Sequence, residues 1–303
     1  MKDYIISEKE EGMTLLKYSF RLLPGAGQGM IRKFLRNKNI ELNSKKAGGS
    51  EILKAGDRVS FFLSDETFAK FHGNQKTVSD AKPLEKERII YEDEDILIYN
   101  KEAGELSQSD SSCAVSVNDR LLSYAKPDGA FTPSVCNRLD RNTSGLILCG
   151  LSSKGLQTLT AAIRDRQLKK YYLAVCEGRF EKEGPAKLWL RKDESKNISR
   201  ISDTEKPGYD PVETIFTIIK TTEDATLLEA ELVTGKPHQI RASLSHLGHP
   251  IVGDLKYGAK KGRAKRHLLH AARIIFPPDI LDGAAYTAPI PPDMAEFFTD
   301  HSL

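Results

Sequence analysis

The fold of this chain is decided near its middle, by the stretch Cys136-Asn137-Arg138-Leu139-Asp140-Arg141-Asn142-Thr143-Ser144-Gly145-Leu146-Ile147-Leu148. Its polar first part and branched apolar end predict a loop that leads into a buried strand. Asp140 stands between two arginines, whose charges favour an ionised carboxylate at neutral pH. The same residue types suit a simple turn or a helix N-cap, so the stretch alone gives Asp140 no assigned role.

The composition indicates a folded protein with two domains. The length of 303 residues allows two domains of roughly 100 to 200 residues, and 39% hydrophobic residues is ordinary for such a chain. The net charge of +3 by itself names no partner. The 4 cysteines are not spaced as metal ligands or as a disulfide framework, which favours a reducing cytoplasm. Neither a signal segment nor a membrane span is expected, since no apolar run is long enough.

A small unit at the front of the chain carries a basic face. Apolar residues at helical spacing predict two short helices, one holding Leu15 to Leu22 and one holding Ile31 to Leu35. Short strands are expected at 40–43 and 58–63. A basic helix face can be a solvated surface or a binding site. The basic residues of this unit are Arg32, Lys33, Arg36, Lys38, Lys45 and Lys46.

A polar segment separates this unit from the rest of the chain. Residues 66–87 show no periodicity and few apolar residues, which predicts a linker. The next unit opens with apolar runs at 89–91 and 96–99 around an acidic turn, a hairpin signal. A helix is expected after Ser152 and Ser153, which offer an N-cap.

The stretch Lys170-Tyr171-Tyr172-Leu173-Ala174-Val175 is typical of a strand. Adjacent residues of a strand point to opposite faces. One of the two tyrosines is therefore expected in the core, and the other is free to face a site.

A helix is expected from Pro237 to Gly248, because apolar residues recur there at helical spacing. His238 and Arg241 are three residues apart and share the polar face of this helix. They are expected to project together from the beginning of a buried helix.

The loop from Lys256 to His267 is the strongest polyanion signal in the sequence. It has no acidic residue, and glycine and alanine separate its basic residues. A merely solvated loop is the other interpretation. The basic residues are Lys256, Lys260, Lys261, Arg263, Lys265 and Arg266.

Three separated motifs carry a resemblance to a known family. The first is Asn137-Arg138-Leu139-Asp140 with Thr143-Ser144-Gly145-Leu146, and the second is Lys170 to Val175. The third is Thr234-Gly235-Lys236-Pro237-His238-Gln239-Ile240-Arg241, which continues through Gly248-His249-Pro250-Ile251-Val252-Gly253-Asp254 and on to Leu269-His270-Ala271. In this order they resemble the RluA family of RNA pseudouridine synthases. The resemblance covers residues 88–295. It implies an α+β fold with a mixed, mostly antiparallel sheet.

The resemblance assigns roles to individual residues. It implies Asp140 as the catalytic aspartate, Tyr172 as the active-site tyrosine and Arg241 as the basic partner of the aspartate. Arg138 resembles the arginine that holds RNA around an extruded uridine, whereas Arg141 keeps a structural role. Three positions depart from the family pattern and leave the subgroup open: Asn137 replaces His, Lys236 replaces Arg, and Glu102 replaces Pro.

The front unit is similar to the alpha-L RNA-binding domain, although Leu42-Asn43-Ser44 replaces the usual Val-Asn-Gly. The implied domains are 1–75, with a core at 12–65, a linker at 66–87 and a catalytic domain at 88–303. Phosphate contacts hold an RNA without reading its sequence. The residues expected to make them are Arg32, Lys33, Arg36, Lys260, Lys261, Arg263, Lys265 and Arg266.

The resemblance predicts an isomerase that converts uridine to pseudouridine in structured RNA. Large-subunit ribosomal RNA is favoured as partner and transfer RNA stays open, in a cytoplasmic monomer without cofactor or metal. The aspartate can attack the sugar or the uracil ring, or act as a base. A non-catalytic RNA-binding or ribosome-assembly protein is the alternative. A glycoside hydrolase would need a second carboxylate, and none stands out in the motifs.

Overall fold

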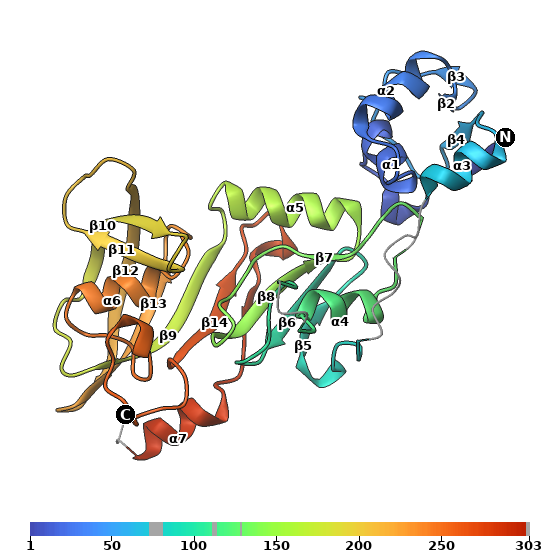
Figure 1. Ribbon diagram of the computed structural model, residues 1–303. Coiled ribbons are helices and arrows are strands. Elements are labelled where there is room, and N and C mark those ends of the chain that lie inside the picture. Colours follow the sequence, from blue (N-terminus) through green and yellow to red (C-terminus); the bar gives the residue numbers. More distant parts are fainter. Residues whose placement is uncertain (73–80, 111–113, 128, 301–303) are drawn as a thin grey trace. The chain divides into compact units, whose positions relative to one another are not determined.

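The chain divides into two units that interleave along the sequence. Figure 1 labels the helices and strands. The structure is a computed structural model that describes residues 1–72, 81–110, 114–127 and 129–300. Unit 1 joins Met1–Ile98, Gln108–Asn137 and Leu148–Ala161, and unit 2 joins Tyr99–Ser107, Arg138–Ile147 and Ala162–Leu303. The domain boundaries expected near residues 75 and 88 stay a prediction.

Unit 1 begins with a four-stranded sheet and two helices that pack on it. The apolar faces predicted for these helices are buried, and the Thr14 hydroxyl caps the first one by accepting from the Lys17 N–H. Both helices and both strands predicted here are therefore confirmed. The strand order is β1 (Lys2–Ile5), β4 (Arg58–Phe61), β2 (Ile40–Leu42), β3 (Lys45–Lys46), and the helices are α1 (Leu15–Leu22) and α2 (Gln28–Arg36).

A third helix, α3 (Asp65–His72), occupies the beginning of the predicted linker. The Phe68 ring is 2% exposed and stacks on Tyr4 at 6.2 Å between ring centroids. This aromatic packing stabilises a helix that lacks a clear apolar period, which is why the sequence pattern did not predict it. The role of the segment as a linker stays a prediction. Residues 73–80 of the predicted linker, and Cys113, lie outside the described residues.

The rest of unit 1 contains the predicted hairpin and helices. Strands β5 and β6 are neighbours, and the carboxylate of Asp93 closes their acidic turn by accepting from two backbone N–H groups. The elements are β5 (Ile89–Glu92), β6 (Ile96–Lys101), α4 (Val117–Tyr124), β7 (Ser134–Val135), β8 (Ser144–Gly150) and α5 (Ser153–Arg164). The last residues of β6 and the first residues of β8 belong to unit 2.

Unit 2 is built on one large sheet with the order β11-β10-β12-β13-β9-β14-β8. Every neighbouring pair is antiparallel except β14 and β8, which are parallel, so the predicted mixed and mostly antiparallel sheet is confirmed. The elements are β9 (Lys169–Glu177), β10 (Gly184–Asp193), β11 (Ile198–Ser202), β12 (Asp210–Thr221), β13 (Ala225–Leu232), α6 (Gln239–His246), β14 (Leu269–Ile275), β15 (Ala285–Thr287) and α7 (Pro292–Asp300).

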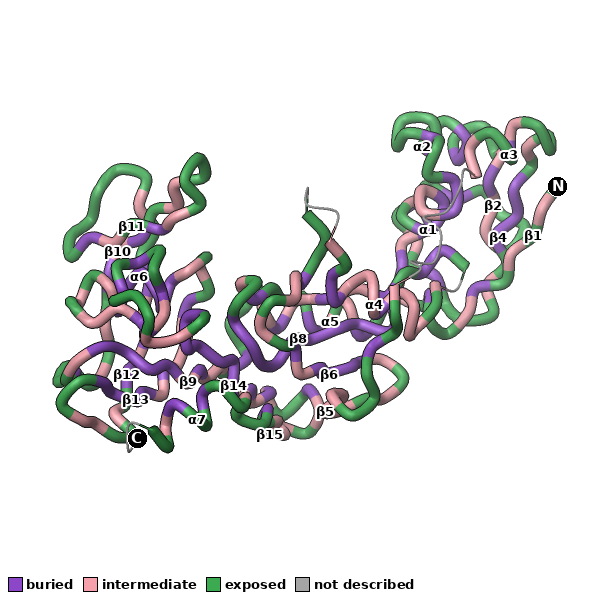
Figure 2. The backbone as a smooth tube through the Cα atoms, turned by 60° about the horizontal axis from the view of Figure 1, so that its bottom comes forward, coloured by how far each residue is buried: buried purple, intermediate pink, exposed green. Residues whose placement is uncertain are grey.

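Most residues of the central strands β9, β14 and β8 are buried (Figure 2). Every residue of β8 is buried, as its apolar run predicts. Gly145 lies where β8 approaches β14, with a φ of +111°. A Cβ there would lie 2.2 Å from the Ala271 carbonyl oxygen, so only glycine allows the close pairing that places the preceding loop. Within the described residues, no helix is both long and apolar enough to cross a membrane.

Candidate active site

The loop before β8 holds Asp140 by hydrogen bonds to its neighbours. The Ser107 hydroxyl accepts from the Leu139 N–H at 3.0 Å and donates to the Leu139 carbonyl at 2.9 Å. The Thr143 N–H donates to the Asp140 carbonyl at 3.0 Å, which closes a turn. The buried ammonium of Lys101 donates to the Arg141 carbonyl at 3.1 Å. The backbone on both sides of Asp140 is therefore fixed.

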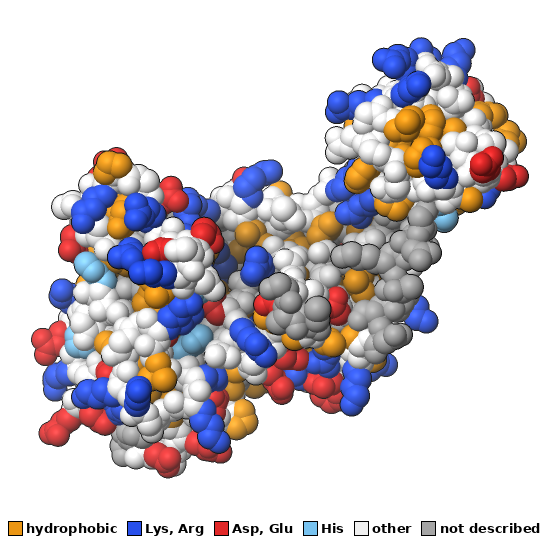
Figure 3. All heavy atoms as spheres, in the orientation of Figure 1, with side chains coloured by type: hydrophobic (Ala, Val, Ile, Leu, Met, Phe, Trp, Pro, Cys, Tyr) orange, Lys and Arg blue, Asp and Glu red, His pale blue; other side chains and the backbone are white. Residues whose placement is uncertain are grey.

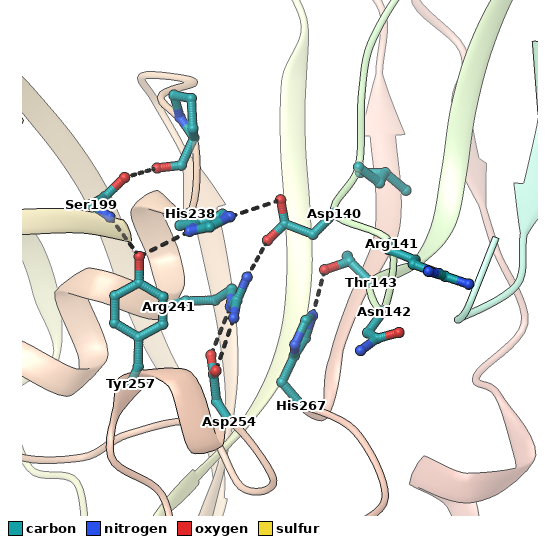
Figure 4. Close-up of polar contacts among 12 residues, drawn as sticks. Asp140, Arg141, Asn142, Thr143, Ser199, His238, Arg241, Asp254, Tyr257 and His267 are labelled. Atoms are coloured by element: carbon teal, nitrogen blue, oxygen red, sulfur yellow. Dashed lines mark hydrogen bonds and ion pairs between the residues drawn. The ribbon is translucent and has the colours of Figure 1, made fainter. Parts of the chain in front are cut away.

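The carboxylate of Asp140 lies on the guanidinium of Arg241 (Figure 4). Arg241, in the first turn of α6, donates from Nη1 to Asp140 Oδ2 at 2.7 Å. Its Nε and Nη2 donate to the two carboxylate oxygens of Asp254 at 2.7 and 2.8 Å. The side chains of Arg241 and Asp254 are 7% and 2% exposed, whereas that of Asp140 is 28% exposed. Asp254 thus fixes Arg241, and Asp140 is the member of the trio that a substrate can reach.

The surroundings keep Asp140 ionised. Burial acts to raise the pKa of this carboxyl, but the interactions with His238 and Arg241 outweigh it, and the pKa is lowered. Burial lowers the pKa of His238 to about 4, so its ring is neutral at pH 7. The charge that holds Asp140 ionised at neutral pH is therefore that of Arg241.

His238 lies on the other side of the same carboxylate. Its Nε2 is 3.7 Å from Asp140 Oδ1, and its Nδ1 is 2.9 Å from the Tyr257 hydroxyl oxygen. The predicted helix start at Pro237 is wrong by two residues: α6 begins at Gln239, because His238 adopts the left-handed backbone conformation at the N-cap, with φ 55°. His238 and Arg241 nevertheless project together, toward Asp140.

Tyr172 belongs to the buried apolar cluster beside the loop. It is 9% exposed and packs in a cluster with Leu139, Ile240 and Ala271. Burial, and then the charge of Asp140, raises the pKa of the Tyr172 phenol, which stays protonated at neutral pH. Tyr171 lies on the opposite face under the Arg273 guanidinium, at 4.1 Å. The two tyrosines do lie on opposite faces, but the division into one core and one site residue is not observed, because Tyr172 is both in the buried cluster and beside Asp140.

The two arginines that flank Asp140 differ in surroundings. Arg138 is exposed. Arg141 is also exposed, but its Nε donates to the Gly104 carbonyl at 3.0 Å and ties two loops together. The structural role expected for Arg141 fits this bond, and Arg138 is the one that solvent surrounds.

Lys and Arg side chains are exposed on the face shown in Figure 3. The basic residues predicted to contact RNA fall into two groups, exposed residues and residues with partners within the protein. Six of them are exposed and have no ion pair within the described part of the chain. In unit 1 these are Arg32, Lys33 and Arg36 on α2, and in unit 2 they are Lys260, Lys261 and Lys265.

The two arginines of the basic loop from Lys256 to His267 instead bind other groups of the protein. The Arg266 residue is 9% exposed, and its guanidinium binds both carboxylate oxygens of Asp293 at 2.6 and 2.9 Å. Arg263 donates to the carboxylate and the carbonyl of Asp224 at 2.6 and 2.8 Å. The role in RNA contact expected for these two stays a prediction, although their N–H groups already have partners within the protein.

Three residues of the site were missed by sequence reasoning. Asp254 follows Gly253 at the end of the third motif, and it supplies the second carboxylate that was not expected. Both of its oxygens bind Arg241, so it does not serve as a free acid. Tyr257 contacts His238, and His267 Nε2 lies 2.9 Å from the Thr143 hydroxyl. The only signal for them was their position in or just after the motifs.

Comparisons with known proteins agree with this geometry. Residues 95–246 match the family described as RNA pseudouridylate synthase. A ribosomal large subunit pseudouridine synthase C of Rickettsia bellii is 35% identical over 268 residues, 86% of this chain and 88% of that protein. The enzyme of that name from Pasteurella multocida is 32% identical, over 97% of this chain and 92% of that protein. The solved structure of human RNA pseudouridylate synthase domain containing 4 has the same fold, with a TM-score of 0.60 at 19% identity, covering 71% of this chain and 93% of that one. This chain therefore belongs to the RNA pseudouridine synthase family.

Proposed function

We propose that this enzyme converts specific uridines of large-subunit ribosomal RNA into pseudouridine, with Asp140 as the catalytic group. One observation carries the role of Asp140: it is a partly exposed carboxylate held ionised by a buried arginine that a second carboxylate fixes in place. The proposed substrate is inferred from the relatives in Rickettsia bellii and Pasteurella multocida, whose names specify the ribosomal large subunit.

The chemistry requires a group that acts on the glycosidic bond. The bond from C1′ of the ribose to N1 of uracil breaks, and a bond from C1′ to C5 forms. The proton leaves C5 and N1 gains one, so atoms and electrons balance without a co-reactant. An ionised Asp140 can form a transient bond to C1′ or to the uracil ring, or act as a base. Tyr172, with its protonated phenol, can donate a hydrogen bond and pack against the base.

RNA must be held while the uridine leaves the stack, which costs a few kcal/mol. Exposed cations that contact phosphates supply favourable free energy of this size. We assign this role to the exposed basic residues and to Arg138 beside Asp140. The alpha-L-like domain at 1–75 would contribute the cations of α2, and the loop of unit 2 would contribute Lys260, Lys261 and Lys265.

The test is to map pseudouridines in total RNA from cells with and without the gene. We expect one or a few sites in large-subunit ribosomal RNA to disappear, and to return with the wild-type gene but not with Asp140→Ala. Loss of sites in transfer RNA alone would contradict large-subunit ribosomal RNA as the substrate. Full restoration by Asp140→Ala would contradict catalysis by Asp140 and favour an RNA-binding role.

A further inference from the structure

A chain of polar contacts runs from the edge strand of unit 2 to Asp140 (Figure 4). The backbone N–H of Ser199, on β11, donates to the Tyr257 hydroxyl oxygen at 2.8 Å. That oxygen lies 2.9 Å from His238 Nδ1. The opposite nitrogen of the ring, Nε2, lies 3.7 Å from Asp140 Oδ1.

The contacts assign the position of the proton on His238. The backbone N–H can only donate, so the Tyr257 oxygen accepts there and its own proton is directed elsewhere. Nδ1 of His238 is the acceptor at hydrogen-bonding distance. The ring is neutral at pH 7, and its one proton is therefore on Nε2, which faces Asp140.

The other tautomer fits less well. A proton on Nδ1 would make the Tyr257 oxygen accept twice. It would also turn the lone pair of Nε2 toward Asp140 Oδ1, 3.7 Å away, so that two acceptors would face each other.

The backbone of His238 is held in an unusual conformation. Its φ of 55° and ψ of 18° are left-handed, which is uncommon for a residue other than glycine. The next residue anchors the turn, because the buried amide of Gln239 bonds to Thr234, Lys236, Glu213 and Thr214. The side chain of His238 is 8% exposed. The ring therefore has one orientation, between Tyr257 and Asp140.

We propose that His238 is a positioning residue whose Nε2–H orients Asp140 Oδ1, and that Tyr257 and Ser199 keep the proton on that nitrogen. Arg241 holds Oδ2, so His238 determines where the second oxygen points. At 3.7 Å the contact is longer than a hydrogen bond, so Oδ1 remains available to the substrate. The proposal rests on the proposed role of Asp140.

Two substitutions of His238 separate a donor role from a backbone role. His238→Gln places an amide N–H near the position of Nε2 but tolerates the left-handed backbone poorly. His238→Asn suits that backbone and the N-cap, but its shorter amide stands near Nδ1 and cannot reach Asp140. We expect kcat to fall about 10- to 100-fold in His238→Asn and less than about 5-fold in His238→Gln, with KM changed less than about 3-fold.

The reverse order, with Asn near wild type and Gln impaired, would overturn the proposal and leave His238 as a helix cap. Thermal melting of both variants shows whether either loses its fold. Tyr257→Phe keeps the ring under Arg241 and removes only the hydroxyl, and we expect it to lower kcat about 10-fold. Unchanged kcat in this variant would also contradict the proposal.

The tautomer can be measured without RNA. Long-range proton–nitrogen NMR correlation on histidine-labelled protein should place the His238 proton on Nε2 in the wild type, and on a mixture of both nitrogens in Tyr257→Phe. A wild-type proton on Nδ1 would overturn the proposal. If the wild-type protein forms no pseudouridine, both the proposed function and the positioning role of His238 are contradicted. If the wild type is active and the variants have the same activity, only the positioning role is contradicted.

Discussion

The cations around Asp140 and the cations on α2 are held in opposite ways. The side chain of Arg241 is 7% exposed, and its Nε, Nη1 and Nη2 each donate to a carboxylate oxygen. Arg32, Lys33 and Arg36 are exposed on one helix, with no ion pair in the described chain. A buried charge requires partners in one geometry, so a single change there is costly. An exposed charge acts together with the other surface charges and is screened by salt. Its single effect on RNA binding is therefore small and depends on the salt concentration.

The largest effect is expected from Arg241→Lys. An ammonium cannot reproduce the planar contacts to two carboxylates, so Asp254 would be left buried without its partner. We expect kcat to fall at least about 10³-fold, and the free energy of unfolding to fall by about 3 kcal/mol. Urea unfolding and pseudouridine assays on the same preparation measure both.

Arg273→Lys is the matched control. Arg273 pairs with Glu229 at 2.9 Å, but both side chains are about one third exposed, at 36% and 32%. Such a pair contributes less than about 1 kcal/mol, so this variant should remain close to wild type in both assays. Equal losses in the two variants would show that burial does not distinguish these arginines.

The buried histidines of the site should make stability depend on pH. Burial is the main cause that lowers the pKa of His238, His267 and His270 to about 4, against about 6.5 in an unfolded chain. Below pH 6.5 the unfolded state binds these protons first, so the free energy of unfolding falls as pH drops toward 4. The slope is up to about 1.4 kcal/mol per pH unit for each histidine. Urea midpoints at pH 7.5, 6.5, 5.5 and 4.5 measure it, and a flat response down to pH 4.5 would contradict neutral buried rings.

Much of the fold could be predicted because local pattern and tertiary structure agree. The apolar run after Gly145 becomes the buried strand β8, and Leu15 to Leu22 becomes α1. The pairing of Asp140 with Arg241 spans 101 residues and came from the resemblance, since no local pattern reaches that far.

The rest depends on contacts that sequence spacing does not encode. Asp254 lies 13 residues after Arg241, beyond the end of α6, and α3 depends on Phe68 packing against distant rings. In the basic loop, sequence alone does not distinguish the lysines from the arginines as RNA contacts. Arg263 and Arg266 bind carboxylates and carbonyls with several N–H groups, whereas Lys261 extends into solvent.

The smallest effects are expected from substitutions of the exposed basic residues. Replacing Arg32, Lys33 and Arg36 together with Gln should raise KM and lower the slope of log affinity against log salt by up to about 3, with kcat unchanged. Fluorescence binding assays from 50 to 300 mM salt measure the slope.

A matched pair in the basic loop completes this test. Lys261→Gln should lower the same slope by about 1 without changing stability, whereas Arg266→Gln should lower stability because Asp293 and three carbonyls lose their donor. An unchanged slope in both the triple variant and Lys261→Gln would remove these surfaces from RNA binding.

The central claim is that an ionised Asp140 performs the reaction, and Asp140→Asn tests it most directly. The amide keeps the size of the side chain and can still accept a hydrogen bond from Arg241, but it carries no charge. In single-turnover assays with a large-subunit ribosomal RNA fragment, we predict at least about a 10³-fold loss of pseudouridine formation, with Kd for the RNA within a few fold of wild type. Turnover by Asp140→Asn near the wild-type rate would contradict the account.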